Sequence, residues 1–366
     1  MQPTILFERK GTRITAMNKK IEVGILGATG MVGQRFVSLL ENHPWFELRW
    51  LGASDRSAGK SYAEACSWRL RDAMPASARE LPVHECRIGH SPKLVFASLD
   101  SKIAGEVEKE FARAGHVVVS NSSNYRMEAD VPLVIPEVNA DHLGLIGVQR
   151  TNRQWKGMIV TNPNCTTVGL VMSLAPLEAA FGIDKVLMTS MQAVSGAGYP
   201  GVPTLDIMGN VIPYISGEED KVERETQKLL GKFLDGRVQA AKLVVSAHCN
   251  RVLVEDGHTE SISVALKTKA TVEGLKEVWR KYRSTPQERH LPSAPKHPIV
   301  VRDEHDRPQV KFDVNEGHGM ATVVGRVRTC PVLQFKYTAL SHNTIRGAAG
   351  AALLNAELMK TEGLLD

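Results

Sequence analysis

Short apolar runs alternate with amphipathic stretches through the first half of the chain. The runs that we predict to be buried strands cover residues 21–26, 46–52, 94–97 and 116–120. Between them we predict amphipathic helices over residues 31–41 and 103–114. Strands that alternate with helices in this way are typical of a parallel sheet with helices on both faces.

The pattern changes near Thr161. A helix predicted over residues 167–180 is followed by longer strands in which apolar and polar positions alternate. These strands cover residues 185–194, 242–254, 259–268 and 319–329. This alternation predicts a largely antiparallel sheet in a second domain of the α+β class. A last helix over residues 343–360 is rich in glycine and alanine, which let a helix pack closely against a neighbour.

The length of 366 residues exceeds that of one typical domain, so we expect two domains with separate cores. We place the first domain over residues 20–164 and the second over residues 165–341. Residues 1–19 mix charged residues with few apolar ones, which predicts a disordered N-terminal extension.

Composition excludes several classes of function. Apolar residues make up 43% of the chain and charged residues 23%, as in ordinary globular proteins. No apolar run reaches the roughly 20 residues that span a bilayer, and the N-terminus lacks the apolar stretch of a secretion signal. The net charge of +5 comes from scattered residues, without the basic stripe of a nucleic-acid-binding protein. We therefore expect a cytoplasmic protein that binds neither membranes nor nucleic acid.

The cysteines are odd in number and widely spaced, and no CxxC pair occurs. The sequence therefore predicts neither a disulfide framework nor a metal site, and it indicates a protein of a reducing compartment. The five residues are Cys66, Cys86, Cys165, Cys249 and Cys330.

A glycine-rich turn follows the first predicted strand. The segment Gly27-Ala28-Thr29-Gly30-Met31-Val32-Gly33 lies between that strand and a helix, where backbone N–H groups can hold a pyrophosphate. A tight turn without a ligand is the alternative, but the first strand of an alternating series is where a dinucleotide site belongs. In the segment after the second strand, basic and hydroxyl side chains can accommodate a 2′-phosphate and so favour NADP over NAD, while Asp55 leaves room for both. They are Ser54, Arg56, Ser57 and Lys60.

Cys165 differs from the other cysteines because it follows the turn Asn162-Pro163-Asn164 and begins an apolar helix. A helix N-terminus stabilises a thiolate, so Cys165 is a candidate nucleophile, whereas the other four are interpreted as structural. A thiol nucleophile needs a base. Among twelve histidines, His258 follows a turn and begins an alternating strand, with Arg251 just before that turn.

Several motifs in this order resemble the aspartate-semialdehyde dehydrogenase family, in particular its branch from archaea, fungi and some bacteria. They are GATGMVG, ASDRSAGK, SSNYRM, PNCTT, MQAVSGAGYPG, GEEDK, CNRVLVEDGH and SHNTIRGAAGAALLNAEL, and the resemblance begins at about Lys20. It implies an α/β fold with a Rossmann-like nucleotide-binding domain and an α+β catalytic and dimerisation domain. The final segment 342–366 would return to complete the nucleotide-binding domain, and the protein would form a homodimer or homotetramer.

The resemblance also implies roles for individual residues. Cys165 would be the nucleophile, His258 its acid and base, and Gln192 would orient the acyl group. Arg251 would bind the α-carboxylate of the substrate, and Glu218 would bind its α-ammonium. The phosphate would be bound by Arg126, Lys221 and Asn164. The choice between Glu218 and Glu219 stays open. The expected cofactor-binding residues are Gly27, Thr29, Gly30, Met31, Val32, Ser54, Arg56, Ser57, Ser98, Ser195, Gly196 and Asn343.

The implied reaction is the reversible, NADPH-dependent reductive dephosphorylation of L-4-aspartyl phosphate to L-aspartate 4-semialdehyde and inorganic phosphate. It would pass through a thioester on Cys165 and lead toward lysine, threonine and methionine. A site that recognises such an acyl phosphate needs a planar cation for the carboxylate, an acid for the ammonium and further cations for the phosphate. The motifs contain these groups.

Three alternatives to this reading remain. Glu218 argues against an N-acetylglutamyl-phosphate reductase, whose substrate has no free ammonium. A malonyl-CoA reductase resembles the same branch and also uses a cysteine and NADPH, but it has less need of Arg126 and Lys221. A regulator that senses NADP without catalysis belongs to a different class and would form no acyl-enzyme.

Overall fold

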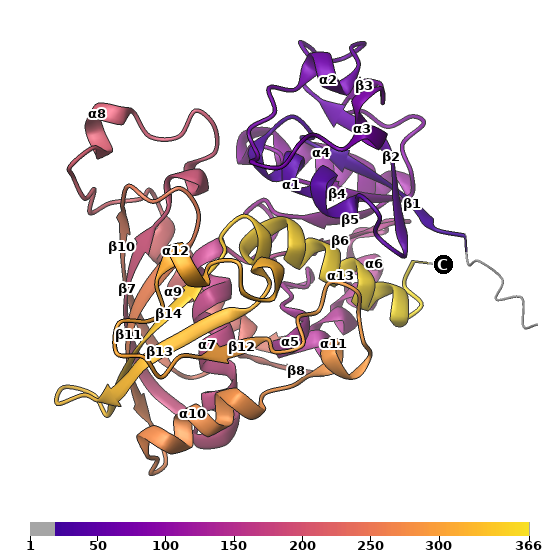
Figure 1. Ribbon diagram of the computed structural model, residues 1–366. Helices are drawn as coiled ribbons and strands as arrows, with labels where there is room; N and C mark the ends of the chain where they lie inside the picture. Colours follow the sequence, from indigo (N-terminus) through magenta and orange to yellow (C-terminus); the bar gives the residue numbers. More distant parts are fainter. Residues whose placement is uncertain (1–18, 366) are drawn as a thin grey trace, which may run out of the picture.

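The computed structural model describes residues 19–365, so the predicted N-terminal extension lies almost wholly outside the described residues. Within this range the strands form two six-stranded sheets and one two-stranded hairpin. Figure 1 shows the first sheet in indigo to magenta and the second in pink, orange and yellow, on opposite sides of the molecule. No helix in the described range is long and apolar enough to cross a membrane.

The first sheet is parallel throughout and has the strand order β3-β2-β1-β4-β5-β6. Its strands are β1 (Ile21–Leu26), β2 (Phe46–Ala53), β3 (Val83–Glu85), β4 (Leu94–Ala97), β5 (Val117–Ser120) and β6 (Met158–Thr161). The connecting segments contain α1 (Met31–Leu40), α4 (Ser101–Ala114) and α6 (Leu145–Arg153). This is the Rossmann strand order, in which the sequence order reverses between β1 and β4 and ligands bind outside the carboxyl ends of these strands. The predicted Rossmann-like fold is confirmed.

The second sheet has the order β10-β7-β11-β14-β13-β12. Its strands are β7 (Ile183–Gln192), β10 (Val244–Arg251), β11 (His258–Leu266), β12 (Ile299–Val301), β13 (Thr322–Thr329) and β14 (Phe335–Ser341). The three central pairings are antiparallel, as predicted, while β10 pairs with β7 and β12 with β13 in parallel. The sheet is therefore mixed, with parallel pairings at its two edges.

Helices α7 (Cys165–Phe181), α9 (Glu218–Leu229) and α10 (Val272–Lys281) pack on one face of this sheet. Side chains along β7 and β11 alternate between that buried face and an exposed face. Helix α7 lies deepest, because its residues are apolar around most of its circumference. A helix that is apolar on all sides must be covered on all sides.

The remaining elements are short and mostly connect the larger ones. They are α2 (Tyr62–Ala65), α3 (Ala76–Arg79), α5 (Pro136–Asn139), α8 (Thr204–Ile207), α11 (Thr285–Glu288), α12 (Val310–Asp313), β8 (Lys232–Leu234), β9 (Arg237–Gln239) and 3₁₀ turns at Ala140–Gly144, Val194–Ala197 and Glu316–Gly319.

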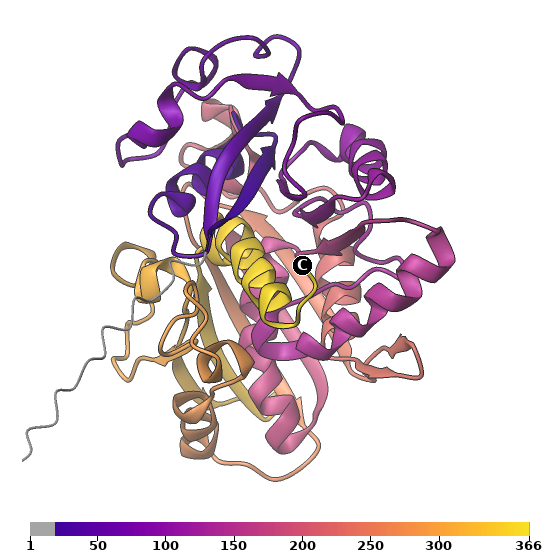
Figure 2. The same ribbon diagram turned by 90° about the vertical axis from the view of Figure 1, so that its right-hand side faces the viewer.

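The final helical segment differs from the single helix that the sequence predicts. It begins as a π-helical turn, Ile345–Ala349, and continues as α13 (Gly350–Thr361). In Figures 1 and 2 the yellow α13 runs between the two sheets, and its apolar side chains belong to the core of the first sheet. The π turn brings Gly347 against Cys165, where a Cβ atom on residue 347 would lie 2.7 Å from the Cβ of Cys165. Only glycine permits this approach.

Arg346, in the same π turn, forms a fully buried ion pair. Its Nη1 and Nη2 donate to the two carboxylate oxygens of Glu137 at 2.8 and 2.7 Å, and both side chains are 0% exposed. The pair fixes the C-terminal segment to α5, because a buried charge must keep its partner.

We expect Arg346→Met to lower the free energy of unfolding by about 3–5 kcal/mol, because Glu137 would be left buried without its partner. Urea unfolding measures this change. The double variant Glu137→Leu, Arg346→Met should regain much of the loss, since it removes both buried charges. A double variant as unstable as the single one would contradict this role of the ion pair.

Candidate active site

One cavity of about 880 Å³ lies between the carboxyl ends of the first sheet and the α7 side of the second. The turns after β1, β4 and β5 line it from one side, through residues such as Gly30, Ser98 and Asn121. The start of α7 and the ends of β7 and β10 line it from the other side. This is the position at which open α/β sheets bind ligands.

The glycine-rich turn forms the nucleotide side of this cavity. Thr29, Gly30, Met31 and Val32 line it, and Gly30 caps α1 without any side-chain hydrogen bond. The first N–H groups of α1 therefore remain for an anion, as a pyrophosphate requires. Gly27 lies beneath the turn instead of lining the cavity. Its φ is +84°, and a Cβ atom there would come within 2.5 Å of the backbone oxygen of Ser98.

The residues expected to select NADP lie outside this cavity. Ser54 and Arg56 are exposed and Ser57 is half-buried, in the turn that follows β2. This turn is adjacent to the glycine turn, because the backbone N–H of Gly27 donates to the oxygen of Gly52 at 2.9 Å. Lys60 lies on the same turn, with its Nζ donating to the carbonyl of Arg56 at 2.9 Å.

Cys165 and His258 are in direct contact, since Sγ lies 3.2 Å from Nε2. Cys165 is the first residue of α7, and the preceding Asn164 caps the helix by accepting from the N–H groups of Thr166 and Thr167. His258 is fully buried behind the thiol, and its Nδ1 accepts the backbone N–H of Ala193 at 3.1 Å. A neutral imidazole whose Nδ1 accepts carries its proton on Nε2, which faces the sulfur.

The ionisation of this pair is controlled by burial and by nearby charges. Burial and, to a smaller extent, the charge of Glu218 raise the pKa of the Cys165 thiol to about 12, against the opposite effects of Arg126 and Arg251. Burial and the charge of Arg251 lower the pKa of His258 to about 3. At neutral pH the pair is therefore an uncharged thiol and an uncharged imidazole, although the helix start favours a thiolate.

The register of the second sheet brings Gln192, Arg251 and His258 together. Gln192 and Arg251 are paired at the ends of β7 and β10, and β11 begins beside them at His258. Arg251 is 6% exposed and donates through Nη1 to the backbone oxygen of Ala193 at 2.7 Å. Both Gln192 and Arg251 line the cavity next to Cys165. An amide and a guanidinium thus flank the sulfur.

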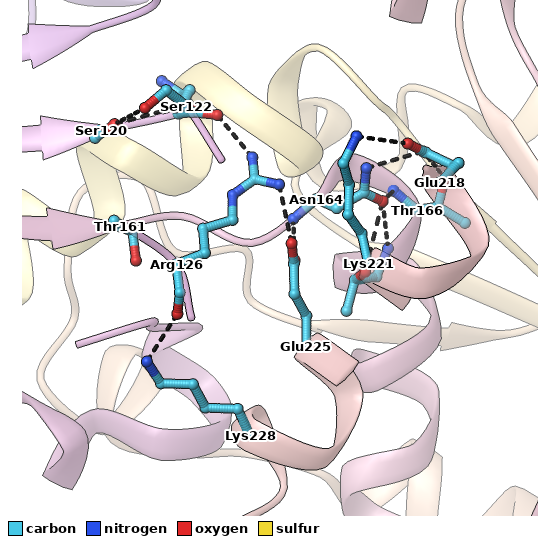
Figure 3. Close-up of polar contacts among 12 residues, drawn as sticks. Ser120, Ser122, Arg126, Thr161, Asn164, Thr166, Glu218, Lys221, Glu225 and Lys228 are labelled. Carbon is cyan, nitrogen blue, oxygen red and sulfur yellow. Dashed lines mark hydrogen bonds and ion pairs between the residues drawn. The ribbon is translucent and has the colours of Figure 1, made fainter. Parts of the chain in front are cut away.

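Helix α9 contributes the carboxylate nearest to the thiol. Glu218 is 6% exposed, lines the cavity and accepts from Asn164 Nδ2 at 2.8 Å, and Lys221 Nζ lies 3.7 Å from its Oε2. Figure 3 shows Lys221 and Asn164 converging on Glu218. Glu219 points elsewhere, since its Oε1 accepts the backbone N–H of Cys249 at 2.9 Å. Of the two neighbouring glutamates, Glu218 is therefore the one in the cavity.

Arg126 reaches the same cavity from the segment after β5. It donates through Nη1 to Glu225 at 3.1 Å and through Nη2 to the backbone oxygen of Asn121 at 2.6 Å. Glu225 was not among the residues predicted from the sequence, nor was Lys228, which also contacts this segment. Both lie on the face of α9 that carries Glu218, at helical spacing, and that periodicity is the signal by which they could have been found.

Ser195, Gly196 and Asn343 line the cavity between the two sheets. Asn343 accepts the N–H of Gly257 at 2.8 Å and donates to Ser195 Oγ at 2.8 Å, while that hydroxyl donates to Asp256 at 2.7 Å. Asp256 also accepts from Arg35 of α1 at 2.9 Å. Asp256 and Arg35 were not predicted from the sequence, and this network joins the nucleotide side of the cavity to the thiol side.

Comparisons with known proteins agree with this arrangement. The family model described as "Semialdehyde dehydrogenase, NAD binding domain" matches residues 22–146, and "Semialdehyde dehydrogenase, dimerisation domain" matches residues 174–346. The aspartate-semialdehyde dehydrogenase of Archaeoglobus fulgidus is 51% identical over 347 residues, which cover 94% of this chain and 100% of the relative. The Saccharomyces cerevisiae enzyme of that name is 47% identical, with 95% of this chain and 99% of the relative covered.

A solved structure has the same fold. The crystal structure of aspartate semialdehyde dehydrogenase with NADP from Candida albicans superposes with a TM-score of 0.87 at 44% identity. The superposition covers 94% of this chain and 100% of that one.

We expect Glu218→Gln to speed the alkylation of Cys165 by iodoacetamide at a fixed pH near 8. The substitution removes a negative charge that raises the pKa of the thiol, and each unit by which that pKa falls raises the thiolate fraction about tenfold. Peptide mass spectrometry resolves Cys165 from the other cysteines. Glu219→Gln is the matched control and should react as the wild type does. Equal rates in the two variants would contradict the assigned electrostatic effect of Glu218.

Proposed function

This chain belongs to the aspartate-semialdehyde dehydrogenase family, and we propose that it reduces L-4-aspartyl phosphate to L-aspartate 4-semialdehyde with NADPH, through a thioester on Cys165. One observation carries the proposal: the contact of 3.2 Å between Cys165 and His258 lies beside a cavity lined by cationic side chains and by a carboxylate, that of Glu218. The proposed pathway role, toward lysine, threonine and methionine, follows from this activity.

The substrate's charged groups match the charges of the cavity. We assign its α-carboxylate to Arg251, whose planar guanidinium suits a carboxylate, and its α-ammonium to Glu218. The phosphate is assigned to Arg126 and Lys221, with Asn164 beside them. Gln192 is assigned to the acyl oxygen, because it ends β7 next to both Arg251 and the sulfur.

In the proposed reaction the sulfur of Cys165 bonds to the acyl carbon while the C–O bond to phosphate breaks, and the thiol proton leaves with the departing phosphate. The phosphate leaves toward Arg126 and Lys221, which carry the opposite charge. Forming a thioester divides one difficult step into two easier ones. Of the acid and base roles expected for His258, the Nε2–H that faces the sulfur supports the acid role, because it donates to the sulfur and stabilises negative charge there when the C–S bond forms or breaks.

NADP fits the residues on the nucleotide side. The cradle has free N–H groups at the start of α1 and a turn so tight that a Cβ atom on residue 33 would lie 2.2 Å from the oxygen of Gly27. Thr29 to Val32 would hold the pyrophosphate, and Ser54, Arg56 and Ser57 the 2′-phosphate. We assign Ser98, Ser195, Gly196 and Asn343 to the nicotinamide end. When bound, the cofactor supplies the hydride.

The oligomeric state is part of the proposal. The exposed face of the second sheet carries Leu187, which is 46% exposed, among small polar residues such as Thr189, Ser261 and Ser263. A cavity of about 310 Å³ lies on this face. We propose a homodimer or homotetramer built through it, in agreement with the dimerisation model that matches residues 174–346. Five cysteines without disulfides agree with a cytoplasmic location, which we also propose.

The activity is tested in the oxidative direction. With aspartate semialdehyde and NADP, the purified protein should form NADPH only when inorganic phosphate is present. Cys165→Ala should lose this activity by on the order of 10³-fold or more, because the covalent route is removed. Activity without phosphate, or turnover of malonyl-CoA in place of the semialdehyde, would contradict the proposal. Mass spectrometry should detect an acyl adduct on Cys165, whereas a regulator without catalysis would form none.

The interface is tested with Leu187→Asp. A buried carboxylate without a partner opposes association, so the variant should elute as a smaller species than the wild type in size-exclusion chromatography. Ile103→Asp is the control, because Ile103 is 54% exposed on α4 of the other half. Equal elution of both variants and the wild type would argue against this interface.

A further inference from the structure

Glu225 lies at a junction that the proposed reaction does not use directly. Its side chain is buried, and its two carboxylate oxygens accept from different parts of the site. Oε1 accepts from Arg126 Nη1 at 3.1 Å, and Oε2 accepts the backbone N–H of Asn164 at 2.6 Å. Figure 3 shows Glu225 rising from α9 between these two donors. One carboxylate therefore joins the guanidinium to the segment that carries the nucleophile.

The Asn164 contact fixes the start of α7. Asn164 is the capping residue, and its side chain already accepts from Thr166 and Thr167. Its own backbone N–H points out of the helix and is bound by Glu225, so the capping turn is held from both sides. Because Cys165 follows directly, the position of its sulfur depends on this turn.

The Arg126 contact leaves part of the guanidinium for a ligand. A guanidinium has five N–H donors, of which Glu225 takes one and the backbone oxygen of Asn121 another. Nε is buried without a partner. The second proton of each terminal nitrogen remains, and Arg126 lines the cavity. A single contact to Glu225 thus orients Arg126 without using up its capacity to bind an anion.

Lys228, one turn after Glu225, fixes the backbone that carries Arg126. Its Nζ donates to three carbonyl oxygens, those of Arg126 at 2.7 Å, Glu128 at 2.8 Å and Val131 at 2.9 Å. All three ammonium protons are therefore used inside the protein. Figure 3 shows Lys228 reaching the carbonyl of Arg126 from below, while Glu225 reaches its guanidinium from the side.

A buried ion pair on its own contributes little net stability compared with apolar residues of the same size. Stability alone therefore does not account for one carboxylate placed between an anion-binding guanidinium and the turn before the nucleophile. We infer that Glu225 is a positioning residue: it holds Arg126 and the Asn164–Cys165 turn in a fixed relation, so that an acyl phosphate meets the guanidinium and the sulfur together. This inference rests on the proposed function.

The amide variant Glu225→Gln separates positioning from packing. A glutamine has nearly the same shape, but it offers one oxygen acceptor and one NH₂ donor. Both partners, Arg126 Nη1 and the Asn164 N–H, are donors, so one of them would face another donor. Arg126 keeps its contact with the oxygen of Asn121, whereas Glu225 is the acceptor of the Asn164 N–H, so we expect the glutamine oxygen to stay with Asn164. The variant therefore loosens the phosphate-binding group while the capping turn and the helix stay in place.

The test measures phosphate, semialdehyde and NADP dependence of NADPH formation in the wild type and in Glu225→Gln. We expect the KM for phosphate to rise about tenfold, the loss typical of one charge-assisted hydrogen bond. The KM values for semialdehyde and NADP should stay within about twofold, because Arg251, Glu218 and the glycine turn are unchanged. The matched control is Glu223→Gln, since Glu223 also lies on α9 and accepts a backbone N–H, that of Ala247, at 3.0 Å.

A fall in kcat without a change in the KM for phosphate would overturn the inference, and so would equal effects in the two variants. If Glu225→Gln does not fold, Glu225→Asp keeps the charge but is too short to reach both donors, and the same rise in KM is expected.

A measurement without turnover separates this inference from the proposed function. Inorganic phosphate should protect Cys165 from iodoacetamide in the wild type and in Glu223→Gln, and about tenfold more phosphate should be needed in Glu225→Gln. Unchanged protection in Glu225→Gln would overturn the positioning role alone. Absence of protection in the wild type would instead argue against the phosphate site of the proposed function.

Discussion

The buried N-terminus of α7 is the constraint on which the site depends. This helix is apolar on most sides and packs against the second sheet, α9 and the C-terminal π turn, and the N–H groups at its start belong largely to buried residues, among them Thr166 and Thr167. Such groups must find partners inside the protein. Asn164 supplies one cap, and Glu225 binds the N–H of Asn164 itself. Cys165 is placed by these contacts.

Four charged side chains surround the sulfur at the start of this helix. Glu218 and Glu225 come from α9, and Arg126 and Arg251 come from segments that these carboxylates and the second sheet hold in place. Glu218 raises the pKa of the thiol and the two arginines lower it, and burial has a larger effect than any of these charges. A neutral thiol is protected from side reactions, since the thiolate is the reactive form.

The C-terminal segment joins the two halves at the same point. The π turn carries Gly347 against Cys165, and the next helix packs into the core of the first sheet. π turns inside helices are frequent at functional sites, because they place backbone where a regular helix would not. The buried pair of Arg346 and Glu137 fixes this turn to α5.

The sequence alone determined the elements whose signals are local. The strands at Ile21–Leu26 and Leu94–Ala97 have the predicted limits, and the glycine turn and Cys165 could be singled out by motif, whereas the choice between Glu218 and Glu219 stayed open. Tertiary structure decided the rest. Alternation of apolar and polar positions is typical of a sheet with one buried face, but it does not fix which neighbour each strand pairs with, so the two parallel edges of the second sheet were not predictable. The helical spacing of Glu225 and Lys228 places them on one face of α9, but whether a charge on that face is buried depends on partners far away in the chain. Only the fold brings Arg126 and Asn164 to one carboxylate.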